Sequence, residues 1–239
     1  MAHTRYNSLI IKPEDQGFEE FAREISAVIM DEYEPVLIEK SVERNYGFLD
    51  RDEVGRIVQI AHSLEWTNDK SDIYPSFSER EALVRGKITE YLKNENAVVP
   101  RGFADFRVRE LSAFAEAITF EAAESYFAER EYEEFTSLLS MFISVRPSLE
   151  KVVHVVWKDG GIRLFNRFKR DITDKYENEF LPYSEANGAK DEDLAISALI
   201  AAAPERLILH NPPSAPFAKT LEKVFEGRCT ICTGCEFCK

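Results

Sequence analysis

All four cysteines of this 239-residue chain lie within its last eleven residues. They are Cys229, Cys232, Cys235 and Cys238, and their constant spacing is C-x2-C-x2-C-x2-C. Thiolates at this spacing can ligate a soft metal, because a tight turn points successive sulfurs inward and aims backbone amides at them. We therefore predict that these four cysteines form a metal site, in which Gly234 supplies a permissive backbone position.

The spacing leaves the identity of the metal open between zinc and an iron–sulfur cluster. A closed four-thiolate zinc site usually joins two C-x2-C pairs that are separated by many residues, whereas here one short segment must surround the ion. Bacterial ferredoxins also contain C-x2-C-x2-C, but here the last spacer is two residues and no proline follows. A reversible disulfide, as in thiol–disulfide redox proteins, and a tail without a chemical role are the remaining alternatives.

Other residues that could do chemistry have ordinary structural interpretations. His154 and His210 lie in two predicted strands that could be neighbours in one sheet. A mixed metal site beside the thiolates is one interpretation, and we favour the other, partly buried histidines bonded to backbone or carboxylates. For the basic residues interleaved with aromatics from Arg163 to Arg170, we favour pairing with the protein's own carboxylates over binding of single-stranded nucleic acid. No phosphate-binding loop, nucleophile elbow or H-E-x2-H motif is present, so whether the protein is an enzyme stays open.

Composition and charge indicate a compact acidic protein. Lys and Arg number 30 against 43 Asp and Glu, which gives a formal charge of -13, and 44% of the residues are hydrophobic. This negative charge weighs against nucleic acid and membrane surfaces as partners, because both are polyanions. The longest apolar stretch, Leu194 to Ala203, is too short to cross a bilayer. Since no extracellular signal accompanies the cysteines, we predict a cytoplasmic location.

The hydrophobic spacing predicts an α+β (mixed α/β) fold. In the first hundred residues we expect two strands, with a helix between them that Pro35 ends, and then two helices. Asp50 or Asp52 is the predicted cap of the first of these two helices. The predicted strands are Tyr6 to Lys12 and Val36 to Val42, and the later helix runs through Ala82 to Leu92.

From Phe103 to Val145 the pattern predicts two consecutive helices, separated by a charged patch at Glu129 to Glu134, which form the main helical layer. The period then changes, and we expect this layer to cover a small mixed sheet with a β-hairpin and a βαβ-like unit near the C-terminus. The hairpin is Val152 to Trp157, the turn Asp159-Gly160-Gly161 and Ile162 to Phe165. The later elements are a polar loop Pro182 to Asp193, a helix Leu194 to Ala203, a strand Arg206 to His210, a helix Phe217 to Phe225 and a strand Arg228 to Ile231.

These elements suggest four regions along the chain. We predict an N-terminal α/β region at 1–97, a central helical layer at 98–150, a C-terminal α/β region at 151–228 and a cysteine-rich tail at 229–239.

Five stretches of the chain are informative when they are considered together: VPRGFADFRVRELSAF, EREYEEFTSLLSMFI, VVHVVWKDGG, DEDLAISALIAAAPERLILH and VFEGRCTICTGCEFC. Together they resemble the YtxC-like family of putative sporulation proteins. They span roughly Val98 to Cys238, and the tail takes part through Cys232, Cys235 and Cys238. The resemblance implies a cytosolic protein of endospore-forming bacteria that is tied to sporulation, and it brings no established reaction, substrate or cofactor.

Three functional hypotheses follow from these observations. The leading one is a sporulation-associated cytosolic protein of unknown biochemical activity that binds a metal or an iron–sulfur cluster through its C-terminal cysteines. The second is a thiol–disulfide redox protein or sensor. The third is a non-catalytic interaction module, in which the helices of Phe103 to Val145 dock an unidentified protein partner.

Overall fold

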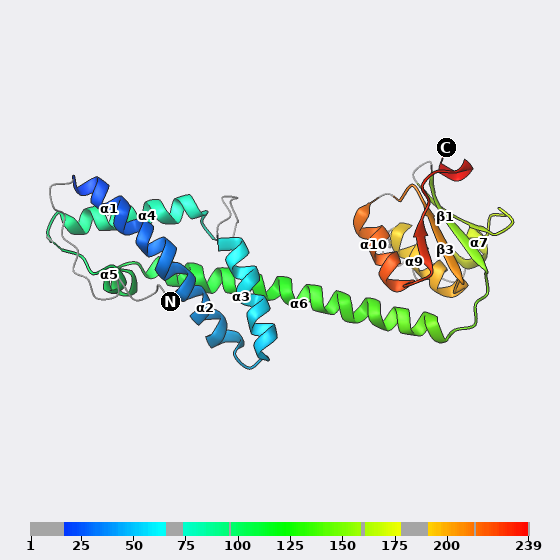
Figure 1. The fold of residues 1–239 in the computed structure, drawn as a ribbon, viewed down its shortest axis with the longest axis horizontal. Coiled ribbons are helices and arrows are strands. Elements are labelled where there is room, and N and C mark those ends of the chain that lie inside the picture. The colour runs from blue at the N-terminus through cyan, green and yellow to red at the C-terminus, as the bar shows by residue number, and fades with distance from the viewer. Residues whose placement is uncertain are drawn as a thin grey trace. The chain divides into compact units, whose positions relative to one another are not determined.

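The computed structural model describes residues 17–65, 74–95, 97–158, 161–177, 191–212 and 214–238. Contacts divide the chain into two compact units, with the boundary between Arg130 and Glu131. Figure 1 shows that this boundary falls inside one long helix, α6. It coincides with none of the three predicted region boundaries, which stay predictions.

The first unit is almost entirely helical in its described residues. Its elements are α1 Phe18–Val28, a π-helical turn Ile29–Tyr33, α2 Glu34–Tyr46, α3 Arg51–Glu65, α4 Phe77–Leu92, α5 Pro100–Arg107 and the first part of α6 Arg109–Val145. Two apolar clusters hold these helices together. One lies where α1, α4 and α5 meet, around Ile25, Ile88 and Phe103. The other joins α2, α3 and α6 through Ile38, Ile57 and Ile118.

The predicted strand at Val36 to Val42 is wrong, because this segment belongs to α2. Pro35 does not end the preceding helix; it occupies the first turn of α2, where its missing N–H has no intrahelical partner to lose. The π-helical turn directly before α2 lets the chain pass from α1 to α2 without leaving helical geometry. Ile38 and Val42 are fully buried at a four-residue interval, so packing of one helix face overrides their β-propensity.

The charged patch at Glu129 to Glu134 does not divide the central helices as predicted. Residues 109–145 contain no Gly or Pro and form the single helix α6. The break lies earlier, at Val108, which separates α6 from the short α5. Arg130 pairs with Glu53 of α3 at 2.7 Å, so a charged residue can lie on the helix surface without interrupting it. The predicted cap of α3 is confirmed, because Asp50 Oδ1 accepts hydrogen bonds from the amides of the first turn.

The second unit contains a four-stranded sheet with the strand order β2-β1-β3-β4. β1 pairs antiparallel with β2, while β1 with β3 and β3 with β4 are parallel pairs. This confirms the predicted α+β class, the hairpin and the βαβ-like unit, which is β3-α10-β4. The elements are β1 Val152–Lys158, β2 Gly161–Asn166, α7 Thr173–Glu177, α9 Asp191–Ala202, β3 Arg206–His210, α10 Ala215–Val224, β4 Cys229–Ile231 and the short 3-10 helix η2 Glu236–Cys238.

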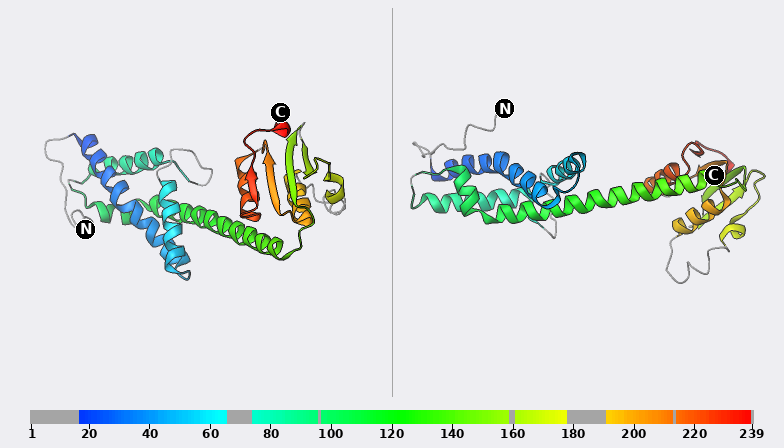
Figure 2. Two further views of the ribbon diagram at one scale, coloured as in Figure 1. Left: turned by 45° about the vertical axis from the view of Figure 1, so that its right-hand side comes forward. Right: turned by 90° about the horizontal axis from the view of Figure 1, so that it is seen from below.

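One face of this sheet is covered by helices. Val153 and Val155 of β1 and Leu207 and Leu209 of β3 pack with α9, with α10 and with Ile143 near the end of α6. Because side chains alternate along a strand, His154 and His210 lie on the opposite face of the sheet. Figure 2 shows the helices beside the sheet.

Some sequence predictions lie outside the described residues. They are the strand Tyr6 to Lys12, residues 159 and 160 of the hairpin turn, and residues 182–190 of the polar loop. Among the residues that the structure does describe, no helix is both long enough and apolar enough to span a membrane.

Candidate metal centre

The ends of two parallel strands place the first residues of the candidate centre. β3 and β4 are neighbours, so their carboxyl ends lie at one edge of the sheet. His210 is the last residue of β3, and Cys232 directly follows β4. The amide of Cys232 donates to the carbonyl oxygen of Leu209 at 2.8 Å, which continues the strand pairing beyond β4. The sheet therefore fixes the backbone of His210 relative to that of Cys232.

The tail then turns back toward this edge. The amide of Gly234 donates to Sγ of Cys232 at 3.5 Å, and the amide of Phe237 donates to Sγ of Cys235 at 3.3 Å. Amide-to-sulfur contacts of this kind are what the two-residue spacing predicts. Gly234 has φ +140°, a conformation that side-chain-bearing residues rarely adopt, which confirms its predicted permissive role. In Figure 1 the tail is the red segment marked C.

Four donor atoms converge at the end of the tail. Nδ1 of His210 lies 3.3 Å from Sγ of Cys235 and 3.4 Å from Sγ of Cys238. The two sulfurs are 3.9 Å apart, and with Sγ of Cys232 all four donor atoms lie within 4.8 Å of one another. The structure thus brings together three of the four predicted cysteines and adds His210.

Cys229 lies outside this group of donors. It is the first residue of β4, pairs in register with Leu207 and packs against the core of the second unit. Burial raises the pKa of the Cys229 thiol to about 12, so at neutral pH it carries its proton. The regular spacing of the four cysteines gives no sign of this difference, because it arises from strand pairing.

A second histidine, His154, contacts His210 through the ring nitrogen that does not face the sulfurs. Nδ1 of His154 lies 3.0 Å from Nε2 of His210, and the two rings are 5.2 Å apart. The ring of Phe237, between Cys235 and Cys238 in the sequence, lies 5.2 Å from each imidazole. The prediction that the histidines are sheet neighbours is confirmed. The two histidines contact each other, and His210 also contacts the sulfurs, so the partners are not the backbone or carboxylates that we favoured.

Burial and nearby groups set the protonation of these side chains. Burial lowers the pKa of His210, and the adjacent His154 lowers it further. Burial also lowers the pKa of His154, with Lys169 and Arg206 acting in the same direction. For Cys235, burial opposes ionisation, but hydrogen bonds from the Phe237 amide and from neighbouring thiols lower its pKa overall. A neutral imidazole and an accessible thiolate are the forms that bind metal ions.

Two of the four basic residues in the stretch from Arg163 to Arg170 pair with carboxylates, as favoured from the sequence. Arg163 contacts Asp171 at 3.3 Å, and the ammonium of Lys169 contacts Glu236 in the tail. The second contact ties the turn after β2 to the segment that carries the cysteines. Lys169 therefore lies beside the candidate centre, whereas Arg163 pairs with a carboxylate that follows β2.

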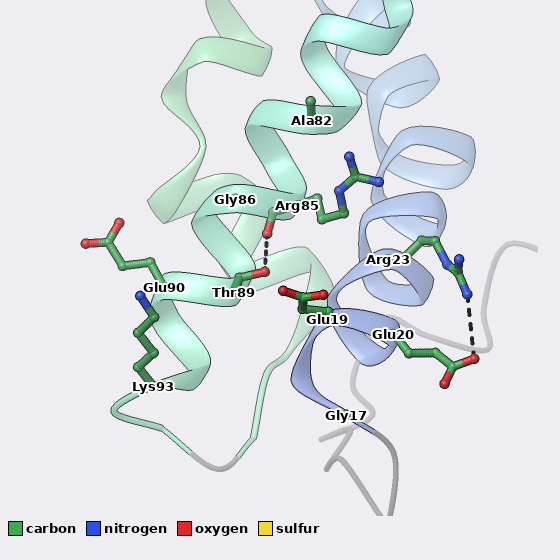
Figure 3. Close-up of a pocket in the computed structure, with 10 residues that line it drawn as sticks. All are labelled: Gly17, Glu19, Glu20, Arg23, Ala82, Arg85, Gly86, Thr89, Glu90 and Lys93. Carbon is green, nitrogen blue, oxygen red and sulfur yellow. Dashed lines mark hydrogen bonds and ion pairs between the residues drawn. The ribbon is translucent and has the colours of Figure 1, made fainter.

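A groove between α1 and α4 of the first unit is a weaker candidate. Figure 3 shows that its walls carry both cationic and anionic side chains, among them Arg23, Arg85 and Glu90. The groove has a volume of about 970 Å³, and Gly86 and Ala82 leave space along α4. It contains no cysteine or histidine, and Arg23 already pairs with Glu20 at 3.6 Å. Nothing in this arrangement selects a ligand.

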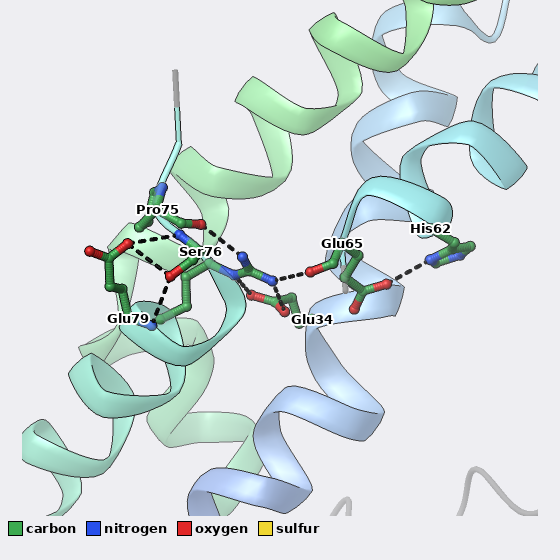
Figure 4. Close-up of polar contacts among 7 residues, drawn as sticks. Glu34, His62, Glu65, Pro75, Ser76 and Glu79 are labelled. Carbon is green, nitrogen blue, oxygen red and sulfur yellow. Dashed lines mark hydrogen bonds and ion pairs between the residues drawn. The ribbon is translucent and has the colours of Figure 1, made fainter. Parts of the chain in front are cut away.

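A buried charge network in the first unit has a structural explanation (Figure 4). The guanidinium of Arg80 donates to both carboxylate oxygens of Glu34, at 2.8 and 3.1 Å. It also donates to the carbonyl oxygens of Glu65 and Pro75, and it lies 3.6 Å from the centre of the Phe114 ring. Burial raises the pKa of Glu34 to about 7, although Arg80 opposes this shift. The network joins α2, α3, α4 and α6, and no sequence motif predicted it.

Comparison with known proteins supports the resemblance seen in the sequence. The YtxC-like family matches residues 19–230, so the match reaches further toward the N-terminus than Val98. It ends before Cys232, Cys235 and Cys238, which leaves most of the candidate centre outside the matched residues.

A protein of Bacillus subtilis (strain 168), named "Uncharacterized protein YtxC", is 27% identical over 194 residues, which are 78% of this chain and 67% of that protein. No solved structure matches the chain. Because the family match covers nearly the whole chain, the protein belongs to the YtxC-like family.

Proposed function

We propose that the second unit binds one tetrahedral zinc ion through Nδ1 of His210 and the Sγ atoms of Cys232, Cys235 and Cys238. The observation that carries this proposal is the spacing of the donors. Zinc lies about 2.3 Å from sulfur and about 2.0 Å from nitrogen, so tetrahedral geometry separates neighbouring donors by roughly 3.5 to 3.8 Å. The distances of 3.3, 3.4 and 3.9 Å among three of these donors bracket that range.

The same spacing argues for a single ion over an iron–sulfur cluster. The ligands of a cluster are distributed over two or more irons, so some of the donor atoms must be far apart. Here all four donors lie within 4.8 Å of one another. Three thiolates and one imidazole form a common ligand set for structural zinc.

Four protein ligands leave no coordination position for water or substrate, which is the pattern of a structural site. The ion would join the end of β3 to the tail and hold Phe237 against the face of the sheet that carries His154. Because the ligands come from both a strand and a terminal segment, binding would be coupled to ordering of the tail. We therefore propose a structural role for the zinc, without a catalytic step.

We propose sporulation, in the cytoplasm, as the biological setting. The support for this setting is the resemblance of the sequence to its family. The test is the yield of heat-resistant spores in a strain whose only copy carries Cys235→Ser. A yield equal to that of the wild type would contradict a role of the zinc site in sporulation.

Metal analysis of the full-length protein tests the proposed site directly. We expect anaerobically purified protein to contain one equivalent of zinc, and cobalt substitution to give the visible spectrum of a tetrahedral thiolate site. Cys235→Ser and Cys238→Ser should lower the affinity for zinc strongly, because each removes one of four ligands. Cys229→Ala is the matched control, since Cys229 has the same chemistry but lies outside the donor group, and it should retain one equivalent.

Three results would overturn this assignment. Iron together with acid-labile sulfide would show a cluster instead of a single ion. Equal loss of zinc in Cys229→Ala and Cys235→Ser would show that Cys229 is also a ligand, and would support the four-cysteine site predicted from the sequence. Protein that binds neither zinc nor cobalt, with all four thiols freely reactive, would exclude a metal site.

The close approach of Cys235 and Cys238 favours one second candidate, a thiol–disulfide redox function. Their sulfurs are 3.9 Å apart and Cys235 is exposed, so little movement would allow a disulfide to form. This function predicts that metal-free protein forms a Cys235–Cys238 disulfide with a defined reduction potential, and that Cys235 reacts faster than a free thiol. The absence of both properties would exclude it.

A further inference from the structure

An apolar stripe runs along the part of α6 that belongs to the second unit. It consists of Phe135, Leu138, Phe142 and Val145, and these residues are 60%, 61%, 49% and 76% exposed. The intervals of three, four and three residues keep all four on one side of the helix. Met141 and Leu149 extend the exposed apolar surface beside it. Surfaces of this kind on a folded unit commonly mark a protein interface.

The second unit does not use this stripe for its own core. Ile143 and, partly, Leu139 are the α6 side chains that pack against the sheet and α9. Thr136 is also buried, and its hydroxyl bonds back to carbonyl oxygens of the preceding turn. These residues lie on a different side of the helix from the stripe. The helix therefore has one face that the unit buries and a second apolar face that it leaves exposed.

We propose that this stripe pairs with the same stripe of a second copy of the chain, with the two helices antiparallel. The spacing is self-complementary about a point near Ser140. In that register Phe135 lies opposite Val145 of the second copy, and Leu138 lies opposite Phe142. Every apolar position thus meets another apolar position, in the alternating layers of an antiparallel coiled coil.

The charges at the two ends of the stripe support the antiparallel direction. Glu131 and Glu134 lie at its N-terminal end, and Arg146 lies directly after Val145 at the other. In the same register the acidic end of one helix meets Arg146 of the second copy. A parallel pair would place the glutamates of both copies together, which costs free energy through like-charge repulsion.

The size of the surface is sufficient for a dimer. With Met141 and Leu149, the stripe exposes roughly 600 Å² of apolar surface, estimated from aromatic and aliphatic side chains that are about half to three-quarters exposed. Two copies would together bury roughly 1,200 Å², which reaches the lower bound of stable, specific interfaces. The interface has two-fold symmetry, so it closes at two copies and does not propagate.

Sedimentation of the full-length, zinc-containing protein over a range of concentrations tests the proposal. We expect a monomer–dimer equilibrium for the wild type. Leu138→Lys should raise the dimer dissociation constant by at least about 30-fold, because it places a charge at the centre of the interface. Ser137→Lys is the matched control, since it adds the same charge at the adjacent exposed position outside the stripe, and it should change the constant little.

Circular dichroism of both variants shows whether a loss of the dimer is caused by unfolding. If Leu138→Lys is monomeric and retains the helical signal and melting temperature of Ser137→Lys, the stripe is the interface. A wild type that stays monomeric at about 100 μM overturns the proposal. A dimer that is equally stable in both lysine variants also overturns it, because the interface then lies elsewhere.

Cysteine cross-linking tests the register and direction. Copies with Phe135→Cys mixed with copies with Val145→Cys should form a disulfide between residues 135 and 145, identified by mass spectrometry of the linked peptides. Phe135→Cys alone should form none at residue 135. A self-linked Phe135→Cys dimer would show parallel helices and would overturn the antiparallel pairing.

Discussion

Nε2 of His210 lies 3.0 Å from Nδ1 of His154, while Nδ1 of the same His210 ring faces the sulfurs of Cys235 and Cys238. If Nδ1 of His210 binds zinc, Nε2 carries the proton and donates a hydrogen bond to Nδ1 of His154. A histidine ligand usually donates its second N–H in this way, which fixes both its tautomer and its ring orientation.

His154→Phe should therefore weaken zinc binding. The substitution keeps an aromatic ring against Phe237 but removes the acceptor for His210, and the loss of such a partner typically costs roughly 10- to 100-fold in affinity. His154→Asn restores an acceptor oxygen near the position of Nδ1 and should recover most of that affinity. Competition with a chromophoric chelator measures these constants.

The control is His62→Asn, which removes a histidine of the first unit that is distant in the sequence from the candidate centre. It should leave the zinc affinity unchanged. Equal affinities for His154→Phe and the wild type would show that His154 does not orient the ligand.

Gly234→Ala should reduce zinc affinity through the backbone alone. A Cβ at this position meets no atom within 4 Å, so the substitution causes no clash. The cost arises because φ is +140°, and holding a side-chain-bearing residue in such a conformation costs about 1 to 3 kcal/mol. Because zinc binding requires this turn, the affinity should fall by roughly 5- to 150-fold.

The neighbouring substitution Thr233→Ala is the control, since Thr233 is exposed and has no positive φ. The same chelator competition compares the two variants. An unchanged affinity in Gly234→Ala would mean that the bound form uses a different turn.

The stability of the first unit should fall as pH rises toward neutrality because of Glu34. Burial raises its pKa in the folded state to about 7, above the ordinary value of 4.5. Between these values the folded state holds a proton that the unfolded chain releases, so raising the pH favours unfolding. Burial also raises the pKa of Glu65, which acts in the same direction.

Urea unfolding at pH 5 and pH 7.5 tests this contribution. Most of the helical residues that the structure describes belong to the first unit, so the far-UV circular dichroism signal mainly follows its unfolding. The stability of the wild type relative to Glu34→Gln should decrease as the pH rises. A difference that stays constant or grows with pH would contradict the raised pKa.

Local patterns were enough to predict much of the second unit. A short run of β-branched residues followed by a glycine-containing turn predicted the hairpin, and the strand–helix–strand order around Phe217 predicted the parallel crossover. The same reasoning failed at Val36 to Val42, where β-branched residues lie in a helix. Their burial depends on α3 and α6, which are distant in the sequence, and local propensity contains no information about such packing. The ion pair between Glu34 and Arg80, which are 46 residues apart, could not be predicted for the same reason.

For the candidate centre, the sequence by itself determined that clustered, soft donors lie in a short terminal segment with one glycine. Only the tertiary structure decided which of them converge. Cys229 belongs to a strand, and its sulfur packs into the core, whereas the three later cysteines follow the last strand and turn back toward the sheet. His210 joins them because β3 and β4 are parallel neighbours, so their ends lie at one edge. Spacing along a chain fixes the type and order of ligands, but strand pairing fixes which atoms come within bonding distance of one ion.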